Sequence, residues 1–237
     1  MKYFPLLLAA LLRRKPRTVY TMLSVTVAFV LFGMLHAISA GFDAGGAVAG
    51  ADRLIVTGKY SLTEMMPYSH QEVIRSVPGV KDVTKQAWFG GYYQDERMFW
   101  PQGPGVPGSY LDRYPEMIIP AEQRKAFENT RTGAIIAKSL ADRYGFKLGD
   151  RIPITAGIWP LKDGSNAWVF DLVGIFDMAD PSQRGPFEML VFNHEYFNEA
   201  KQFGKDLAGW FIVRVNDPAK SAQVAAAIDA AFRNSPH

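Results

Sequence analysis

A glycine-rich stretch with the spacing of a phosphate-binding loop lies near the middle of the sequence. Gly103, Gly105 and Gly108 form the pattern G-x-G-x-x-G, which in a dinucleotide-binding unit places backbone N–H groups and a helix N-terminus around a pyrophosphate. Here Pro104 and Pro107 occupy two of the intervening positions, and each removes a backbone N–H donor. We therefore interpret this stretch as a stiff surface loop and not as a nucleotide site.

Residues that could act as nucleophiles or metal ligands are few and scattered. The sequence has no cysteine, which excludes disulfides, thiolate metal sites and a cysteine nucleophile. It also contains no G-x-S-x-G elbow, no H-E-x-x-H zinc motif and no Walker A loop. The four histidines are dispersed, and we expect them at the surface or in helix packing: His36, His70, His194 and His237. The sequence thus predicts no catalytic residue, no metal and no cofactor.

Two pairs of acidic residues keep an enzyme alternative open. Asp95 with Glu96, or Asp177 with Asp180, could supply the acid and the base that glycoside hydrolysis needs. Carboxylates in turns are usually only solvated, and that is our interpretation of both pairs. An anchored periplasmic hydrolase would instead require an acid and a base in one cleft.

Aromatic residues are concentrated between positions 88 and 100. Trp88, Tyr92, Tyr93 and Trp100 belong to this group, and their density is typical either of a core or of a surface that binds an apolar ligand or a partner. We favour the core as the general explanation, because alternating strands must bury one face. We name these four residues as the candidate partner or cargo surface.

The first 41 residues determine where these side chains lie in the cell. Arg13, Arg14, Lys15 and Arg17 precede a stretch without formal charge from Val19 to Ala40. About 21 residues at ~1.5 Å each match the hydrocarbon thickness of a bilayer. By the positive-inside rule the amino terminus is cytoplasmic, and everything after Gly41 lies on the other side of the membrane. The absence of cysteine fits a bacterial periplasm, so we expect this membrane to be the bacterial inner membrane. A cleaved signal peptide is the alternative, but its apolar region would be shorter.

The charged residues also distinguish the membrane anchor from the rest of the sequence. The first 17 residues carry five lysines and arginines and no acidic residue, so the other 220 residues carry 21 basic and 23 acidic side chains. The net charge of +3 therefore reflects the anchor, and it gives no support to nucleic-acid binding. We expect three parts: a basic, amphipathic cytoplasmic elbow at 1–17, a transmembrane helix at 18–41 and an external domain at 42–237.

The external domain has mixed α and β patterns and belongs to the α+β class. Ser69 and Glu72 have the spacing of a helical capping box, and Gly145 stands where a left-handed residue would end a helix. Asn193 and Asp217 are expected helix N-caps, and residues 41–50 are the expected linker. Strands are expected in the segments DRLIVTG, VKDVTKQAWF, GAIIA, RIPIT, AWVFDLVGIFD, FEMLVFN and GWFIVRVN.

The order of these features resembles the N-terminal half of MacB-like ABC-transporter permeases, also described as the FtsX-like permease superfamily. The resemblance extends over essentially the whole sequence. Its most specific part is Ile135 to Asp150, in which a strand, a helix containing Leu-Ala and a Gly-Asp turn follow in the order of the family. The segments "DLVGIFD" and "FIVRVNDPAKSAQVAAAIDAAFRNSP" follow in the same order.

The resemblance implies a two-lobed external domain and a set of partners. A porter-like lobe would combine Leu54 to about Phe89 with about Gly209 to Phe232, and a second lobe would be inserted between them. In the family the permease dimerises and works with a separate cytoplasmic ATPase, so that nucleotide-driven closure moves the external domains. Members export macrolides or peptides, extract lipoproteins or transmit a mechanical signal.

The sequence differs from the family in having one span. Members continue into about three further spans, whereas this sequence stops at His237 without a second apolar run. We expect a permease truncated before its C-terminal spans, with those spans among its partners. A stand-alone, single-span periplasmic adaptor or sensor is the alternative.

Overall fold

A computed structural model describes residues 13, 15–49, 52–61, 63–97 and 100–233. The protein forms two compact units, which divide between Val48 and Ala49. Residues 1–12 and Arg14 of the elbow predicted at 1–17 lie outside the described residues, whereas its last residues, Lys15 to Arg17, already belong to a helix.

The first unit is a single long helix, α2 (Lys15–Ala49). Its segment Lys15–Ala37 is long and apolar enough to cross a membrane, and its side chains are exposed. At ~1.5 Å per residue the whole helix is about 52 Å long, more than the ~30 Å of a hydrocarbon core. The prediction of a linker at residues 41–50 is therefore wrong up to Ala49, because extending an existing helix costs far less than starting a new one.

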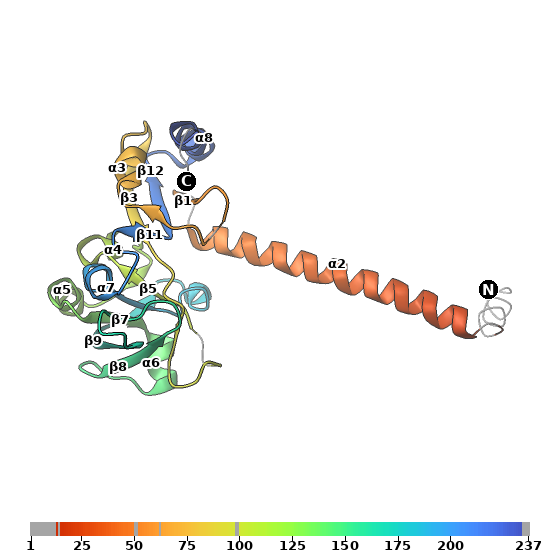
Figure 1. The fold of residues 1–237 in the computed structure, drawn as a ribbon, viewed down its shortest axis with the longest axis horizontal. Coiled ribbons are helices and arrows are strands. Elements are labelled where there is room, and N and C mark those ends of the chain that lie inside the picture. The colour runs from red at the N-terminus through yellow and green to blue at the C-terminus, as the bar shows by residue number, and fades with distance from the viewer. Residues whose placement is uncertain (1–12, 14, 50–51, 62, 98–99, 234–237) are drawn as a thin grey trace. The chain divides into compact units, whose positions relative to one another are not determined.

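The second unit contains two lobes with separate apolar cores. The first lobe is a three-stranded antiparallel sheet in the order β1-β12-β3, covered by α3 and α8 (Figure 1). Its strands are β1 (Arg53–Thr57), β3 (Val80–Gln86) and β12 (Trp210–Val215), and its helices are α3 (His70–Arg75) and α8 (Ser221–Ala231). The core between them includes Ile74, Val83, Phe211, Val213, Val224 and Ile228.

The second lobe is inserted between β3 and β12. Its mixed sheet has the order β4-β8-β9-β7-β10-β5, with β6 paired to β9. The strands are β4 (Gly91–Tyr92), β5 (Gln102–Gly105), β6 (Met117–Ile118), β7 (Gly133–Ala137), β8 (Arg151–Ala156), β9 (Ala167–Met178) and β10 (Leu190–Asn193). The helices are α4 (Pro107–Arg113), α5 (Ala121–Asn129), α6 (Lys138–Tyr144) and α7 (His194–Ala200). The short strands β2 (Met66–Pro67) and β11 (Leu207–Ala208) pair with each other.

Aromatic rings fill the core of the second lobe. Phe170 and Phe192 stack with ring centroids 4.4 Å apart, and Phe89 meets Phe192 edge-on at 4.9 Å. Trp168 and Phe197 are buried in the same cluster. The β-strand patterns of the sequence thus converge on one aromatic core, as the core interpretation of the aromatic segment expects.

The glycine- and proline-rich stretch is not the surface loop that we predicted. Gln102–Gly105 forms β5, all four residues are buried, and Pro107 begins α4. Proline is tolerated in this strand because β5 lies at the edge of its sheet, where a missing N–H removes no hydrogen bond between strands. Pro107 is likewise tolerated because the first helical N–H has no partner in any case.

Helix-end signals were right in three of four places. Asn193 accepts hydrogen bonds from the N–H groups of Glu195 and Tyr196, and Asp217 accepts one from Ala219 at the start of η2 (Pro218–Lys220). Gly145 ends α6 with φ +72°. Ser69, however, makes no capping hydrogen bond, because its backbone is already helical, unlike that of a regular N-cap.

Replacing Gly145 should measure the cost of a left-handed position directly. A Cβ at this site would meet no atom within 4 Å, so only the backbone conformation opposes a side chain. We expect Gly145→Val to lower the free energy of unfolding by about 1–3 kcal/mol. Gly145→Asn, which tolerates this conformation, should cost clearly less. Urea unfolding of the full-length protein in detergent, monitored by tryptophan fluorescence, measures the free energy of unfolding of both variants. Equal losses of free energy would show that steric crowding, and not the positive φ, causes the destabilisation.

Candidate functional site

The two lobes meet at a junction of arginines and carboxylates. Arg53, in β1, donates two hydrogen bonds to Glu116 of the second lobe, at 2.7 Å and 3.0 Å. Its side chain is 6% exposed, and its guanidinium lies 4.7 Å from the ring centre of Tyr114. Burial acts to lower the pKa of Arg53, but the hydrogen bond and charge of Glu116 raise it above its ordinary value. The bidentate pair thus keeps a buried charge compensated.

Two further arginines attach the other strands of the first lobe to the same segment. Arg113, at the end of α4, donates to Asp82 in β3 at 2.7 Å. Arg214, in β12, pairs with Asp52 at 3.0 Å and reaches the backbone oxygen of Asp112 at 3.4 Å. All three strands of the first lobe therefore contact residues 112–116, and the junction resists bending of one lobe against the other.

A second polar contact joins the lobes on the side of α7. The hydroxyl of Tyr68 lies 2.9 Å from His194 Nε2 and donates to Asn198 Oδ1 at 3.2 Å. Because this hydroxyl has one proton, His194 Nε2 must be the donor to Tyr68. Asn198 in turn donates to Asp206 at 2.8 Å.

His194 is a structural residue of this contact and not the surface group that we expected. It is buried, and its ring packs against that of Tyr68. Burial, followed by the positive charges of Lys85 and Lys201, lowers the pKa of His194 to about 3. The imidazole is therefore neutral at ordinary pH, and it offers a hydrogen bond in place of a charge.

Lys201 is the most unusual titratable group of the second lobe. Its side chain is 2% exposed, and its Nζ has no hydrogen-bond partner. The amine lies 4.9 Å from the ring centre of Trp159 and 4.7 Å from that of Phe197. Burial lowers the pKa of Lys201 to about 8, although the charge of Asp206 opposes this. The two aromatic faces are the contacts that accommodate its positive charge.

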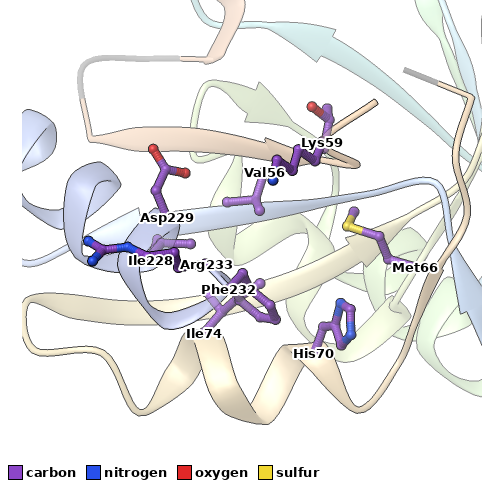
Figure 2. A pocket seen from close by; sticks show the side chains of 10 residues that line it. Val56, Lys59, Met66, His70, Ile74, Ile228, Asp229, Phe232 and Arg233 are labelled. Atoms are coloured by element: carbon purple, nitrogen blue, oxygen red, sulfur yellow. The ribbon is translucent and has the colours of Figure 1, made fainter. Parts of the chain in front are cut away.

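A groove of about 420 Å³ opens in the first lobe between β1, α3 and α8. Figure 2 shows Ile74 and Phe232 close together in its lining; Ile74 is buried, whereas Lys59, Asp229 and Arg233 are exposed. The lining thus combines apolar and exposed charged side chains, and it contains no arrangement of a nucleophile with a base.

Of the candidate partner residues, only Trp88 is widely exposed. Trp88 is 54% exposed and lies at the end of β3, whereas Trp100 is 3% exposed and belongs to the core of the second lobe. Tyr92 and Tyr93 are half-buried, and Tyr93 packs edge-on against Tyr144 at 5.5 Å. Trp100 is therefore wrong as a surface residue, because its ring fills the space that the strand pairing encloses.

Sequence reasoning missed two exposed apolar residues, of which one lies next to Trp88. Ile158 and Trp88 both contact the position that a Cβ on Gly90 would occupy, so they lie side by side. Ile158 is exposed, as is Phe203, whose ring lies 5.2 Å from that of buried Trp159. No local signal marks either residue, because a single apolar residue in a turn is common.

The remaining predicted residues have structural explanations. Lys15 and Arg17 are exposed at the start of α2, and Arg13, which precedes this helix, is exposed as well. Asp177 accepts two hydrogen bonds from Arg184 at 2.7 Å, and Asp180 caps the turn η1 (Pro181–Gln183). Within the described residues no cluster of histidine, aspartate and glutamate could hold a metal ion.

Breaking the buried junction should be costly. We expect Arg53→Ala to lower the free energy of unfolding by roughly 1.5–3 kcal/mol, because it removes two hydrogen bonds from Glu116, whose side chain is only 21% exposed. The matched control is Lys138→Ala, which removes an exposed i,i+4 pair with Asp142 worth about 0.3–0.5 kcal/mol. Urea unfolding of the full-length protein compares the two variants; similar small losses would mean that the junction is solvated and does not hold the lobes.

Lys201 should make stability depend on pH. The unfolded protein holds the lysine proton up to its ordinary pKa of 10.5, whereas the folded protein loses it near 8. Because the unfolded state then binds more protons, wild-type stability should rise from pH 8 to 10.5 relative to Lys201→Met. Denaturant titrations at pH 7, 8.5 and 10 measure this difference, with exposed Lys138→Met as the control. If the free energy of unfolding changed with pH in the same way for wild type and Lys201→Met, the burial of the amine would be contradicted.

Comparison with known proteins agrees with this architecture. The periplasmic region of MacB from Actinobacillus actinomycetemcomitans matches with a TM-score of 0.51 and 11% identity, over 77% of this chain and 82% of that one. The extracellular domain of the noncanonic ABC-type transporter YknZ from Gram-positive bacteria matches with a TM-score of 0.49 and 14% identity, over 77% of this chain and 92% of that one. No curated protein matches. The sequence matches the family of MacB-like periplasmic core domains over residues 18–231, and the protein belongs to that family.

Proposed function

We propose that this protein is the membrane-anchored periplasmic part of an ABC-transporter permease, which couples a separate cytoplasmic ATPase to export or to mechanical work across the bacterial inner membrane. The observation that carries the proposal is the family match over residues 18–231, which begins within the apolar helix and extends through both lobes. The amino terminus is cytoplasmic in this proposal, because Arg13, Lys15 and Arg17 precede the apolar segment of α2.

The external domain has a mechanical role in this proposal and carries out no chemical step. Two arginine ion pairs and one hydrogen bond from Arg214 to the backbone oxygen of Asp112 join the lobes and support it, because a body that transmits displacement must not deform at its own junction. The partners are the cytoplasmic ATPase, the remaining permease spans and a second copy of the protein. Nucleic acid is not a partner.

Trp88 is the centre of the proposed partner or cargo surface. With Ile158 beside it, it offers exposed aromatic and aliphatic area at low entropic cost. Tyr92 and Tyr93 contribute at the margin of this surface.

The proposed coupling between the ATPase and the external domain can be tested by fluorescence resonance energy transfer between two copies of the protein. The sequence has no cysteine, so Asn166→Cys, at an exposed position of the second lobe, accepts a donor or an acceptor dye alone. We expect energy transfer between copies assembled with the ATPase in native-lipid nanodiscs, and a change in its efficiency when ATP and vanadate are added. Absence of transfer would contradict the dimer.

An unchanged efficiency during ATP turnover would contradict the coupling and favour a stand-alone adaptor or sensor. The matched control is the same label on a protein assembled with an ATPase whose catalytic glutamate is replaced by glutamine. That assembly should change with ATP alone, because it binds nucleotide without turning it over.

A further inference from the structure

Three exposed apolar side chains are arranged around buried Trp159. The Nε1 atom of this indole donates to the backbone oxygen of Trp88 at 2.6 Å. Its six-membered ring lies against Gly204, next to Phe203, whose ring centre is 5.2 Å away. Ile158 precedes Trp159 and lies beside Trp88. We call Trp88, Ile158 and Phe203, which are 54%, 43% and 52% exposed, the Trp88 patch.

Two segments that run side by side carry most of this patch. Residues 157–164 and 200–206 are joined by a backbone hydrogen bond from Gln202 to Pro160, at 2.8 Å. The patch therefore stands on backbone that is already fixed, and its side chains project from it. A surface that is ordered beforehand loses less conformational entropy when a partner binds.

Both carboxylates of these two segments are engaged within the protein. Asp163 accepts a hydrogen bond from the N–H of Ser165 at 2.9 Å. Asp206 accepts one from the side chain of Asn198 at 2.8 Å, and its charge favours the protonated form of buried Lys201. The negative charges next to the patch are thus held by groups of the protein itself.

Two lysines of the same segments have no such partner. Lys162 and Lys205 are exposed, and within the part of the chain that the structure describes their ammonium groups form no ion pair. Lys162 follows Ile158 by four residues, and Lys205 follows Phe203 by two. An apolar centre with charged groups at its rim is the usual anatomy of a protein interface.

We propose that the Trp88 patch docks a protein whose contact region has an apolar centre and an acidic rim. This inference rests on the partner surface proposed above and names the chemistry of the partner. Tryptophan is among the residues that dominate binding energy, and carboxylates of the partner pair with Lys162 and Lys205 and set its orientation. A small molecule fits less well, because such ligands need a concave site that buries most of their surface.

The place of the patch in the fold favours a protein over a membrane surface, to which tryptophan and lysine could also bind. In the register of the first sheet, Arg53 and Asp82 lie at one end, and Thr57 and Gln86 lie at the other. The polypeptide arrives from α2 at the end that contains Arg53, whereas Trp88 follows Gln86. The patch therefore adjoins the end of the sheet that is away from the attachment of the anchor.

Photocrosslinking identifies what occupies the patch. The probe is p-benzoyl-phenylalanine in place of Ile158, in the full-length protein, irradiated in the cells that naturally produce it. We expect a crosslink to a protein, which mass spectrometry maps to an apolar segment flanked by aspartate or glutamate. A product with a lipid, with a second copy of this chain or with a segment without acidic residues would overturn the proposal, as would the absence of any product.

Charge reversal tests the two lysines. We expect Lys162→Glu combined with Lys205→Glu to reduce the yield of this crosslink by at least about tenfold. Lysines in place of the acidic residues of the mapped segment should restore the yield, which also shows that the variant is folded. The matched control combines Lys125→Glu with Lys147→Glu, both exposed and outside the patch, and it should leave the yield unchanged. Equal yields in the two double variants, or no restoration, would overturn the proposal.

These results are independent of the energy-transfer test of the proposed function. If energy transfer changes with ATP but no acidic segment is captured, the assignment of the Trp88 patch is wrong and the coupling stands. If the acidic segment is captured but energy transfer does not change, the coupling is wrong and the docking surface stands.

Discussion

Pairing of β12 between β1 and β3 is the contact on which both lobes depend. The sheet of the first lobe is complete only because residues 210–215 return, across the inserted residues 87–209, to pair with both β1 and β3. The entropy of closing so long a loop grows only slowly with length, so the insertion is tolerated. The insertion nevertheless fixes where the second lobe is attached, because both ends of this lobe must lie where β3 ends and β12 begins.

The arginine junction makes these two lobes one body. Arg53, Arg113 and Arg214 belong to different elements, yet each bridges a strand of the first lobe and the segment around Glu116. In addition, Trp159 Nε1 in the second lobe donates to the backbone oxygen of Trp88, two residues after β3, at 2.6 Å. A permease domain of this family that moves as a unit would require such contacts, since exposed ion pairs alone contribute little.

The sequence predicted the structure correctly where a feature depends on residues close together in the sequence. Gly145 and Asn193 were predicted from side chains that satisfy or terminate their own helix. The apolar span and the α+β class also followed from composition and periodicity. Features that depend on segments distant in the sequence could not be predicted. Pro104 could be placed in a strand only once β5 was known to lie at the edge of its sheet. Trp100 and His194 are buried by segments that are distant in the sequence. The arginine junction likewise has no sequence pattern, because its partners lie up to 162 residues apart.

The most direct test of this account is whether the two lobes keep a fixed separation. Spin labels on Ala222→Cys in α8 and Asn166→Cys in the second lobe, both exposed, report that distance by double electron–electron resonance in the full-length protein. A rigid junction predicts one narrow distance distribution that broadens in the Arg53→Ala variant. A broad or two-peaked distribution in the protein with the unaltered junction would contradict the claim that the two lobes move as one body.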